Sequence, residues 1–513
     1  MPEYRSPGVY VEEVEAGARP IEGVGTSVAA FVGFTGKGPF NSPTMVTSWS
    51  QFAKEFGDFS PGCVLPHAVY GYFLNGGGTC YIVRIGANGS AGPAPGPQAK
   101  LGAFRVLPKE LPAEDGLAPE LTVELSKAEP QEGEQPAPDD RFTLTVKRDG
   151  KVEERFENVT TKRGKGNVLT VVSNQSSLIT LQLVADEVTV TTPQSVTLKP
   201  APATALVPAP AQVATEDYVG DVAERTGFGG LEAVDQVTMV AVPDLMGAFQ
   251  RGAIDAKGVK VVQQAIIDHC ERMRDRMAIL DTPPGMSVQQ VRQWREDSDY
   301  SSMYATLYYP WIEVFDPAAN TARLIPPSGH LAGVWARNDS TRGVHKAPAN
   351  EVVRGAVSLE TQITKNEQAD LNPVGVNCVR VFPGRGVRVW GARTLSGDSN
   401  WRYLNVRRLF NYLEESILDG TQWVVFEPND DALWARIRRT IAAFLVMEWR
   451  KGALFGLTPD EAFYVKCDRE TNPAESIDQG MVVCEIGVAP VKPAEFVIFR
   501  LAQVSGGISL VTE

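Results

Sequence analysis

The sequence predicts a mixed α/β core of sheets flanked by helices, with an inserted all-β domain and extended β arms at both ends. Three observations support this fold class. Short buried strands alternate with amphipathic helices over most of the chain, a pattern typical of sheets covered by helices. Two stretches rich in Pro, Ala and Gly enclose a region of alternating β pattern. Short strand-like runs lie near both ends, and the run near the N-terminal end has no second strand close enough to close a hairpin.

Residues 1–20 are predicted to form an extended arm. Within "SPGVYVEE", Val9, Tyr10 and Val11 favour a strand, because β-branched and aromatic side chains suit a pleated sheet. Acidic and small residues follow at once, and no second strand is close enough to close a hairpin. We therefore expect this strand to find its partner outside the arm.

Residues 91–215 are predicted to form a β domain inserted into a larger one, whose first part is residues 21–90. The flanking stretches "GANGSAGPAPGPQAK" and "KPAPATALVPAPAQ" have the composition of extended linkers. Between them "RFTLTVKRDGKVEERF" alternates about an Asp149-Gly150 turn, and "SSLITLQL" and "EVTVTTPQSVTL" repeat the period of two. A long disordered acidic loop is the alternative, because "EPQEGEQPAPDD" has a disordered composition.

The core continues over residues 216–370 with a predicted βαβ unit. The runs "VTMVAV" and "RMAILD" are typical of short buried strands, and helical spacing connects them over Val259 to Met273. We expect further strands at "ATLYYPWIEVF", "VRVWGAR" and "WVVFEP", and helices near Glu360 and at "NVRRLFNYLEESI". Residues 371–489 are assigned to a separate C-terminal domain.

A long helix is predicted from Asp430 to Lys451. At about 100° per residue, its apolar face is formed by Leu433, Ile437, Ile441 and Phe444. A stripe on another face is formed by Arg436, Arg439 and Arg450. This stripe is either an ordinary solvated surface or a cationic strip that meets an acidic partner surface.

Residues 490–513 are predicted to form the second arm. The segment "PAEFVIFRLAQVSGGISLVTE" has two β stretches, Phe496 to Val504 and Ile508 to Val511, separated by glycines. The residues expected to pair are Phe496, Val497, Ile498, Phe499 and Leu501. An unpaired strand promotes aggregation unless a partner covers it. A chain with such a strand at each end could donate both to other copies of itself.

Composition narrows the functional classes. The 513 residues, 43% hydrophobic, can bury large cores and suffice for about three domains of ~150 residues. The net charge of −13 argues against nucleic-acid binding. There is no signal-peptide pattern, and the longest strongly apolar stretch, Ile441 to Met447, is too short for stable membrane insertion. We therefore expect synthesis in the cytoplasm.

The six cysteines contain no CxxC pair and are interpreted as reduced packing residues.

An enzymatic alternative rests on "ILDTPPG", where Asp281 ends a buried strand as a magnesium-binding acid does in nucleotide hydrolases. Such enzymes need a glycine-rich phosphate loop in which Lys precedes Ser or Thr. The nearest candidate, "GFTGKGPF", places Gly38 and Pro39 after Lys37, so the metal-binding hydroxyl is missing. The alternative that remains is an α/β hydrolase-like enzyme using Asp244 and Asp281 at strand ends.

Neither a metal site nor a cofactor site is predicted. The four histidines form no HExxH motif. There is no GxSxG elbow, and Ser328-Gly329-His330 is interpreted as a loop tripeptide. We therefore expect no catalytic residues and no cofactor.

Several motifs, in order, resemble the tail sheath proteins of contractile phages and of phage-derived contractile injection systems. They are "SPGVYVEE", "TSVAAFVGFTGKGPFNSP", "SWSQFAKEFG", "NGGGTCYIVRI", "YYPWIEVFDP", "IPPSGHLAGVWARNDSTRGVHKAPAN", "LNPVGVNCVRVFPGRGVRVWGARTLS" and "FVIFRLAQV". The resemblance covers nearly the whole chain except residues 91–215, a region that varies among sheath proteins.

The resemblance implies a structural subunit rather than an enzyme. Such subunits form stacked hexameric rings around an inner tube, and their arms complete a small sheet in neighbouring subunits. Contraction from an extended metastable state drives the tube through a target envelope without nucleotide. The implied partners are other copies of the chain, the inner tube protein, and baseplate and terminal cap proteins, without nucleic acid.

The resemblance also implies places for parts of this chain. Residues 371–489 become an inner domain, and the arginine stripe becomes a candidate tube-facing surface. The implied location is the bacterial cytoplasm during assembly, and afterwards a phage tail or phage-tail-like particle.

Overall fold

The computed structural model describes residues 20–86, 99–101, 104–108, 121–127, 141–148, 150–161, 167–183, 194–198 and 209–500. The chain divides into two compact units. Residues 1–87 and 208–513 form the larger unit, and residues 88–207 form the smaller one. The smaller unit is therefore inserted into the sequence of the larger.

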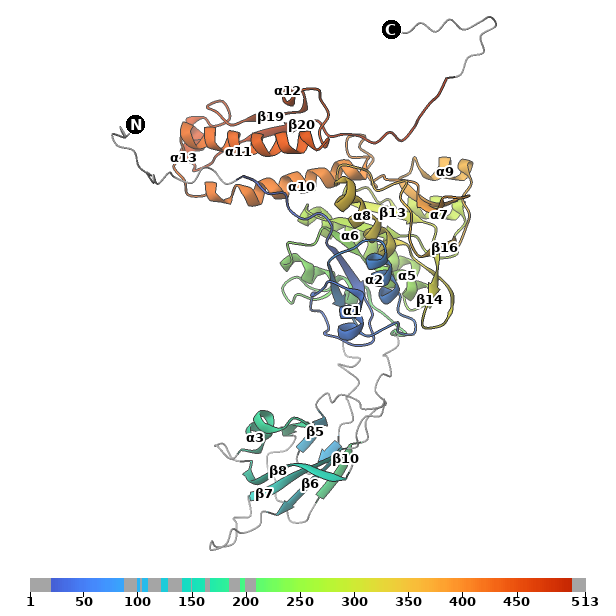
Figure 1. Ribbon diagram of the computed structural model, residues 1–513, viewed down its shortest axis with the longest axis vertical. Helices are drawn as coiled ribbons and strands as arrows, with labels where there is room; N and C mark the ends of the chain where they lie inside the picture. The colour runs from blue at the N-terminus through green and yellow to red at the C-terminus, as the bar shows by residue number, and fades with distance from the viewer. Residues whose placement is uncertain are drawn as a thin grey trace, which may run out of the picture. The chain divides into compact units, whose positions relative to one another are not determined.

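An eight-stranded mixed sheet forms the centre of the larger unit (Figure 1). Its strand order is β18-β17-β13-β12-β11-β1-β3-β2. The six inner strands are parallel: β1 (Ala29–Gly33), β3 (Cys80–Arg84), β11 (Met239–Ala241), β12 (Met277–Asp281), β13 (Ala305–Tyr309) and β17 (Val376–Phe382). The two edge strands are antiparallel to their neighbours: β2 (Thr44–Val46) and β18 (Gly386–Val389). Strands β1, β11, β12 and β13 are buried throughout, as expected for parallel strands covered on both faces.

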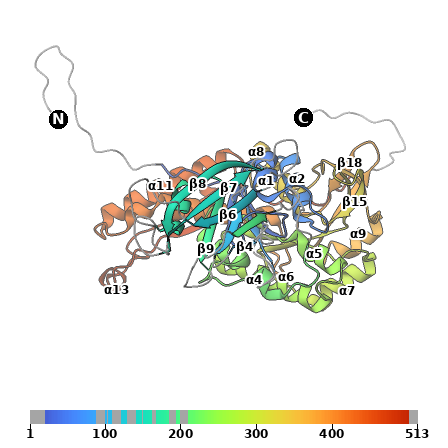
Figure 2. The same cartoon turned by 90° about the horizontal axis from the view of Figure 1, so that it is seen from below.

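Helices cover both faces of this sheet (Figure 2). Helices α2 (Leu65–Leu74) and α8 (Ser328–Arg342) pack together on one face, and α6 (Ala256–Met273) lies on the other. The other helices of this part of the larger unit are α1 (Trp49–Phe56), α4 (Thr215–Val219), the 3₁₀ helix η1 (Gly227–Ala233), α5 (Pro243–Gln250), α7 (Val288–Ser298) and α9 (Lys365–Leu371). A small antiparallel sheet, in the order β15-β14-β16, contains β14 (Ile312–Asp316), β15 (Thr321–Ile325) and β16 (Ala356–Leu359).

The C-terminal part of the larger unit has its own hydrophobic core. Helices α10 (Leu404–Gly420) and α11 (Asp431–Arg450) lie side by side and supply most of its buried side chains (Figure 1). A two-stranded antiparallel sheet, β19 (Phe463–Lys466) and β20 (Glu485–Val488), packs against α11. The short elements here are the 3₁₀ helix η2 (Gln422–Val424), α12 (Pro459–Ala462) and α13 (Ala474–Asp478). A buried ion pair between Arg408 and Asp339, 2.9 Å from Nη1 to Oδ1, connects α10 to α8.

The smaller unit is mostly β. One sheet has the order β10-β6-β7-β8, formed by β6 (Leu121–Lys127), β7 (Arg141–Arg148), β8 (Lys151–Thr160) and β10 (Gln194–Leu198). The other has the order β4-β5-β9, formed by β4 (Ala99–Leu101), β5 (Phe104–Pro108) and β9 (Ile179–Leu183). Gly150, at φ 81°, takes the turn between β7 and β8. Helix α3 (Val168–Gln175) was not predicted, and it packs against β8 and β9.

Three local predictions are wrong. "ATLYYPWIEVF" forms two strands, β13 and β14, because Pro310 lies between them and has no amide hydrogen for a ladder. "WVVFEP" contains η2 rather than a strand. Ser328-Gly329-His330 begins α8 rather than lying in a loop. The helix predicted near Glu360 is present as α9, which begins at Lys365 after a capping box, while Glu360 itself directly follows β16.

The predicted helix over Asp430 to Lys451 is confirmed as α11, and the predicted βαβ unit is confirmed as β11, α6 and β12. In the ranges given above, no helix has both the length and the apolar character needed to cross a bilayer.

Candidate functional site

The segment Phe496–Phe499 is a row of exposed hydrophobic side chains near the C-terminal end. Their exposed fractions are 73%, 68%, 78% and 85%. None of the four is assigned to a strand, and Figure 1 shows the segment leading away from the body. Four adjacent hydrophobic residues exposed in this way are typical of a surface that a partner covers. Of the other predicted arm residues, Val9, Tyr10, Val11 and Leu501 lie outside the described residues.

Glu495 fixes the chain immediately before this segment. Its carboxylate accepts hydrogen bonds from Arg393 at 2.8 and 2.7 Å, from Asn372 Nδ2 at 2.8 Å and from the Tyr403 hydroxyl at 3.3 Å. Burial alone would raise the pKa of Glu495, but the hydrogen bonds from Arg393 and Asn372 outweigh it and lower the pKa. The exposed segment therefore starts from a fixed point on the body. Sequence patterns gave no signal for this contact, because its three donors lie 92 to 123 residues away.

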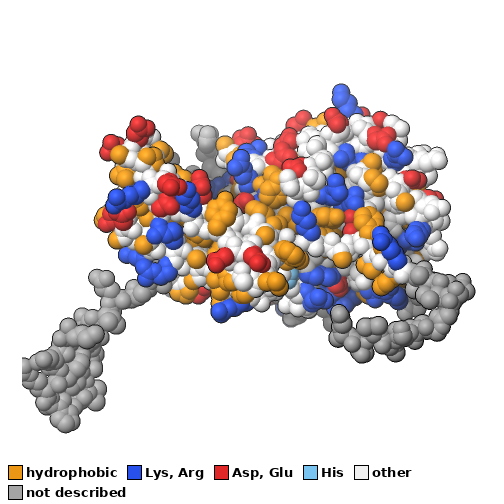
Figure 3. Space-filling model, turned by 90° about the horizontal axis from the view of Figure 1, so that it is seen from above, with side chains coloured by type: hydrophobic (Ala, Val, Ile, Leu, Met, Phe, Trp, Pro, Cys, Tyr) orange, Lys and Arg blue, Asp and Glu red, His pale blue; other side chains and the backbone are white. Residues whose placement is uncertain are grey.

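The β19–β20 sheet has two strands only among the described residues, so each strand has one edge without a ladder partner. Exposed hydrophobic side chains lie on and around it: Phe455, Leu457, Tyr464, Met481 and Val483. Figure 3 shows hydrophobic side chains spread among basic and acidic ones over this side of the larger unit. Open edges and apolar side chains together suit the addition of further strands.

The predicted arginine stripe lies on the exposed side of α11. Arg436, Arg439 and Arg450 are all exposed, whereas the predicted apolar face, Leu433, Ile437, Ile441 and Phe444, is buried. Arg436 is partly neutralised, because it pairs with Glu427 at 3.1 Å and stacks over the Trp423 ring at 4.3 Å. Arg439 and Arg450 form no ion pair with any residue that the structure describes. These two arginines carry the stripe's unpaired charge.

Of the two aspartates of the enzymatic alternative, Asp281 ends β12 as predicted, whereas Asp244 lies in the first turn of α5 rather than at a strand end. Both carboxylates are buried and both bind backbone amides. Asp244 accepts from the amides of Phe34, Val64 and Leu65 at 2.8, 2.6 and 3.2 Å, which ties β1 to the start of α2. Burial raises the pKa of Asp244 to about 6.

Asp281 accepts from the amide of Ser328 at 2.9 Å, at the start of α8, and burial raises its pKa to about 7. The cavity beside Asp281 is about 10 Å³, close to the volume that a single water needs. These contacts favour structural roles for both carboxylates.

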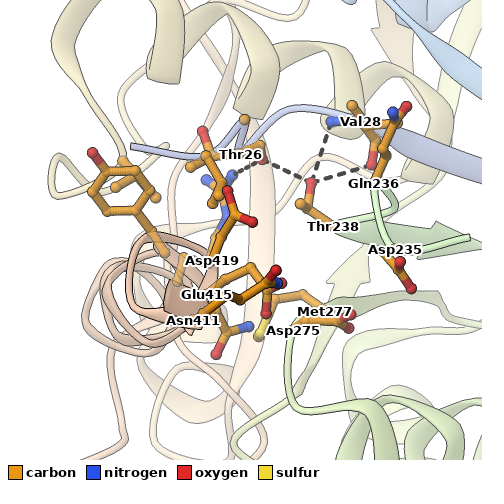
Figure 4. A pocket seen from close by; sticks show the side chains of 16 residues that line it. Thr26, Val28, Asp235, Gln236, Thr238, Asp275, Met277, Asn411, Glu415 and Asp419 are labelled. Carbon is orange, nitrogen blue, oxygen red and sulfur yellow. Dashed lines mark hydrogen bonds between the residues drawn. The ribbon is translucent and has the colours of Figure 1, made fainter. Parts of the chain in front are cut away.

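A larger pocket of about 570 Å³ lies between α10 and the N-terminal ends of the central strands (Figure 4). Its acidic lining residues are Asp235, Asp275, Glu415 and Asp419. Burial, followed by the charges of these neighbours, raises the pKa of Glu415. Within the described part of the chain, no three His, Cys, Asp or Glu side chains are placed to hold a metal ion. Ligands of open parallel sheets bind at the opposite, carboxyl ends of the strands, so this pocket does not match a cofactor site of that kind.

Two family models match consecutive parts of the chain. The phage tail sheath protein central domain matches residues 211–395, and the phage tail sheath C-terminal domain matches residues 396–503. Together they span more than half of the 513 residues. The division between them falls just before α10, where the second hydrophobic core begins.

Similar proteins are found among curated sequences and solved structures. The tail sheath protein of Vibrio phage KVP40 is 25% identical over 52% of this chain, but the match spans only 42% of that relative. The tail sheath protein of Burkholderia phage BcepMu is 24% identical over 92% of this chain and 91% of its own length. The PVC sheath complex of an extracellular contractile injection system, in its contracted state, has a TM-score of 0.60 at 22% identity, covering 98% of this chain and 99% of that one.

Proposed function

Because this chain belongs to the phage tail sheath family and is a structural subunit of a contractile sheath, we propose that its copies stack as hexameric rings around an inner tube. In this proposal the sheath is assembled in an extended, metastable form. Its contraction then drives the tube through a target envelope. Baseplate and terminal cap proteins would hold the two ends.

One observation carries the proposal: the exposed segment Phe496–Phe499 leaves the body from the fixed residue Glu495. A segment with a fixed origin and an unpaired hydrophobic run is suited to donation. Its acceptor in a neighbouring subunit would be the open β19–β20 sheet. The strand predicted from the sequence at Val9 to Val11 would be donated in the same way.

Donation of arms stabilises a lattice through many small contributions. Each added strand makes a few backbone hydrogen bonds with a net value of about 1 kcal/mol each. A subunit that gives two arms and receives two is held by several such strands at once, so the contributions reinforce one another. The arms would also keep neighbours connected while subunits move during contraction.

The arginine stripe is proposed to face the inner tube. The support is the unpaired charge of Arg439 and Arg450 on the exposed face of α11, which suits an acidic tube surface. We also propose that no catalysis is involved, because the two candidate carboxylates bind backbone amides. Assembly in the bacterial cytoplasm, before the particle is complete, belongs to the same proposal.

Truncation of the C-terminal arm tests the proposal. A variant ending at Glu495 should keep its circular dichroism spectrum and cooperative melting, yet sediment as small species and form no tubes in negative-stain micrographs. Deletion of residues 1–20 should give the same result. A matched control lacking only Thr512 and Glu513 should assemble as the full chain does. Contractile tubes from either arm-deleted variant would show that the arms are not what joins the subunits.

A further inference from the structure

Two of the six cysteines face each other at one end of the β19–β20 sheet. The ladder of this sheet pairs Lys466 with Glu485. The next pair outward in the same register is Cys467 and Cys484. Residues directly opposite in an antiparallel pair have their side chains on the same face and their Cβ atoms about 4.5–5.5 Å apart. The register therefore brings two thiols together.

Asn472 holds the two chain segments at this point. Its Nδ2 donates to Cys467 Sγ at 3.8 Å and to the carbonyl of Val483 at 2.9 Å, and its Oδ1 accepts from the amide of Val483 at 2.6 Å. A single side chain thus contacts one cysteine and the residue before the other. The closeness of the two thiols also affects the pKa of Cys484. Burial, followed by the charge of the neighbouring Cys467, raises this pKa to about 12.

We propose that Cys467 and Cys484 form an intramolecular disulfide when the protein meets a low-molecular-weight disulfide such as oxidised glutathione. Cys467 is buried and Cys484 is half-buried, so the reagent would reach Cys484 first. The Cys484 thiolate attacks glutathione disulfide, which forms a mixed disulfide and releases one glutathione thiolate. The Cys467 thiolate then attacks Cys484 Sγ and releases the second glutathione. Two protein thiols are oxidised, one glutathione disulfide is reduced to two thiols, and the protons pass from the protein thiols to the glutathione.

The bond would close the loop that contains α13 and join the ends of β19 and β20. A two-stranded sheet is only marginally stable by itself, and a cross-link that closes a loop restricts the unfolded chain. The thiols would stay reduced in a reducing cytoplasm and form the bond in a more oxidising medium. Because the disulfide can be measured on single subunits, its test does not depend on the proposed sheath assembly.

The test uses the full chain, purified with reductant and then equilibrated in glutathione buffers of increasing oxidised fraction at mildly alkaline pH. After denaturing alkylation and trypsin digestion, we expect the peptide that begins at Cys467 to be linked to the peptide that contains Cys484. Two of the six thiols should become unreactive. The melting temperature should rise and return to its reduced value on addition of dithiothreitol.

The Cys484→Ser variant, changed at the half-buried position, should show neither the link nor the rise in melting temperature. A Cys378→Ser variant, whose cysteine lies on β17, should keep both. Alkylation of Cys467 and Cys484 after full equilibration would overturn the proposal. A glutathione adduct on Cys484 beside a free Cys467 would overturn it as well.

Discussion

Asp281 ends β12 with its carboxylate buried and its Oδ1 bound to the amide of Ser328. Its place at the end of a buried strand was predictable from "RMAILD", because the hydrophobic run marks the strand and the acid ends it. Its role was not predictable. The partner is a backbone amide 47 residues away, and since every residue except proline supplies such an amide, no sequence pattern marks it. Asp244 shows the same limit, with amide partners about 180 to 210 residues away.

The buried Asp281 carboxyl predicts a pH dependence of stability. Its pKa is about 7 in the folded protein against an ordinary value of 3.8. Below the ordinary value both states are protonated. As the pH rises from 3.8 to about 7, the carboxyl loses its proton in the unfolded chain but keeps it in the folded protein. The free energy of unfolding therefore falls over this pH range. The effect is on the order of 4 kcal/mol between pH 4 and pH 8, at about 1.4 kcal/mol per pKa unit.

Asp281→Asn should flatten this dependence, because asparagine keeps the Oδ1 acceptor and carries no charge. The melting temperature of the variant, measured relative to that of the unchanged chain, should therefore rise as the pH increases from 4 to 8. Asp268→Asn, on the exposed side of α6, serves as the matched control and should follow the unchanged chain. Identical pH profiles for all three proteins would contradict the assignment of a protonated, buried carboxyl.

At the scale of elements, periodicity predicted α11 and missed α8. Helix α11 has a buried face and an exposed face, so its apolar residues recur with the helical period. In α8 every residue from Ser328 to Ala336 is buried, so no polar face exists to reveal a period. For "WVVFEP" the sequence pattern predicted an element that the structure lacks. Its residues Val425 and Phe426 favour a strand by type, but both are exposed and do not pack in a sheet. Phe426 lies at φ 68°, a left-handed conformation that does not continue a strand.

The arginine stripe of α11 yields a prediction about tube attachment. Reversal of the two unpaired charges, in Arg439→Glu/Arg450→Glu, should weaken co-sedimentation of sheath with the tube protein while sheath-to-sheath assembly persists. Arg436→Glu should have a smaller effect, because Glu427 already neutralises this side chain. Raising the salt concentration should reproduce the loss, since the Debye length is about 10 Å at 0.1 M.

Arg292→Glu on α7 is the control for a general effect of charge, because Arg292 is also exposed on a helix. Its tube attachment should match that of the unchanged chain. Attachment that survives reversal of Arg439 and Arg450 would identify the stripe as an ordinary solvated surface.

At the scale of the whole molecule, the two units have separate hydrophobic cores. The core of residues 88–207 is built from its own strands and α3, including the Phe104 and Phe142 rings at a centroid distance of 5.8 Å. The core of the larger unit draws on residues before and after the insertion, including Phe31 and Met239 of the paired strands β1 and β11. The described residues that form the core of the larger unit include none from residues 88–207.

The last prediction follows from this separation and concerns the need for the insertion. Replacing residues 88–207 by a short Gly/Ser linker should leave a folded subunit, because loop closure costs little extra free energy as loop length changes. We propose that the insertion lies on the outer surface of the sheath, so the variant should also build tubes in negative stain that contract as usual. A chain that keeps the insertion and carries the same Gly/Ser residues added at residue 208 controls for the linker itself. If the replaced chain melts cooperatively but yields only soluble monomer, the insertion is part of the lattice. If it fails to melt cooperatively while the control does, the larger unit depends on contacts with the insertion for its stability.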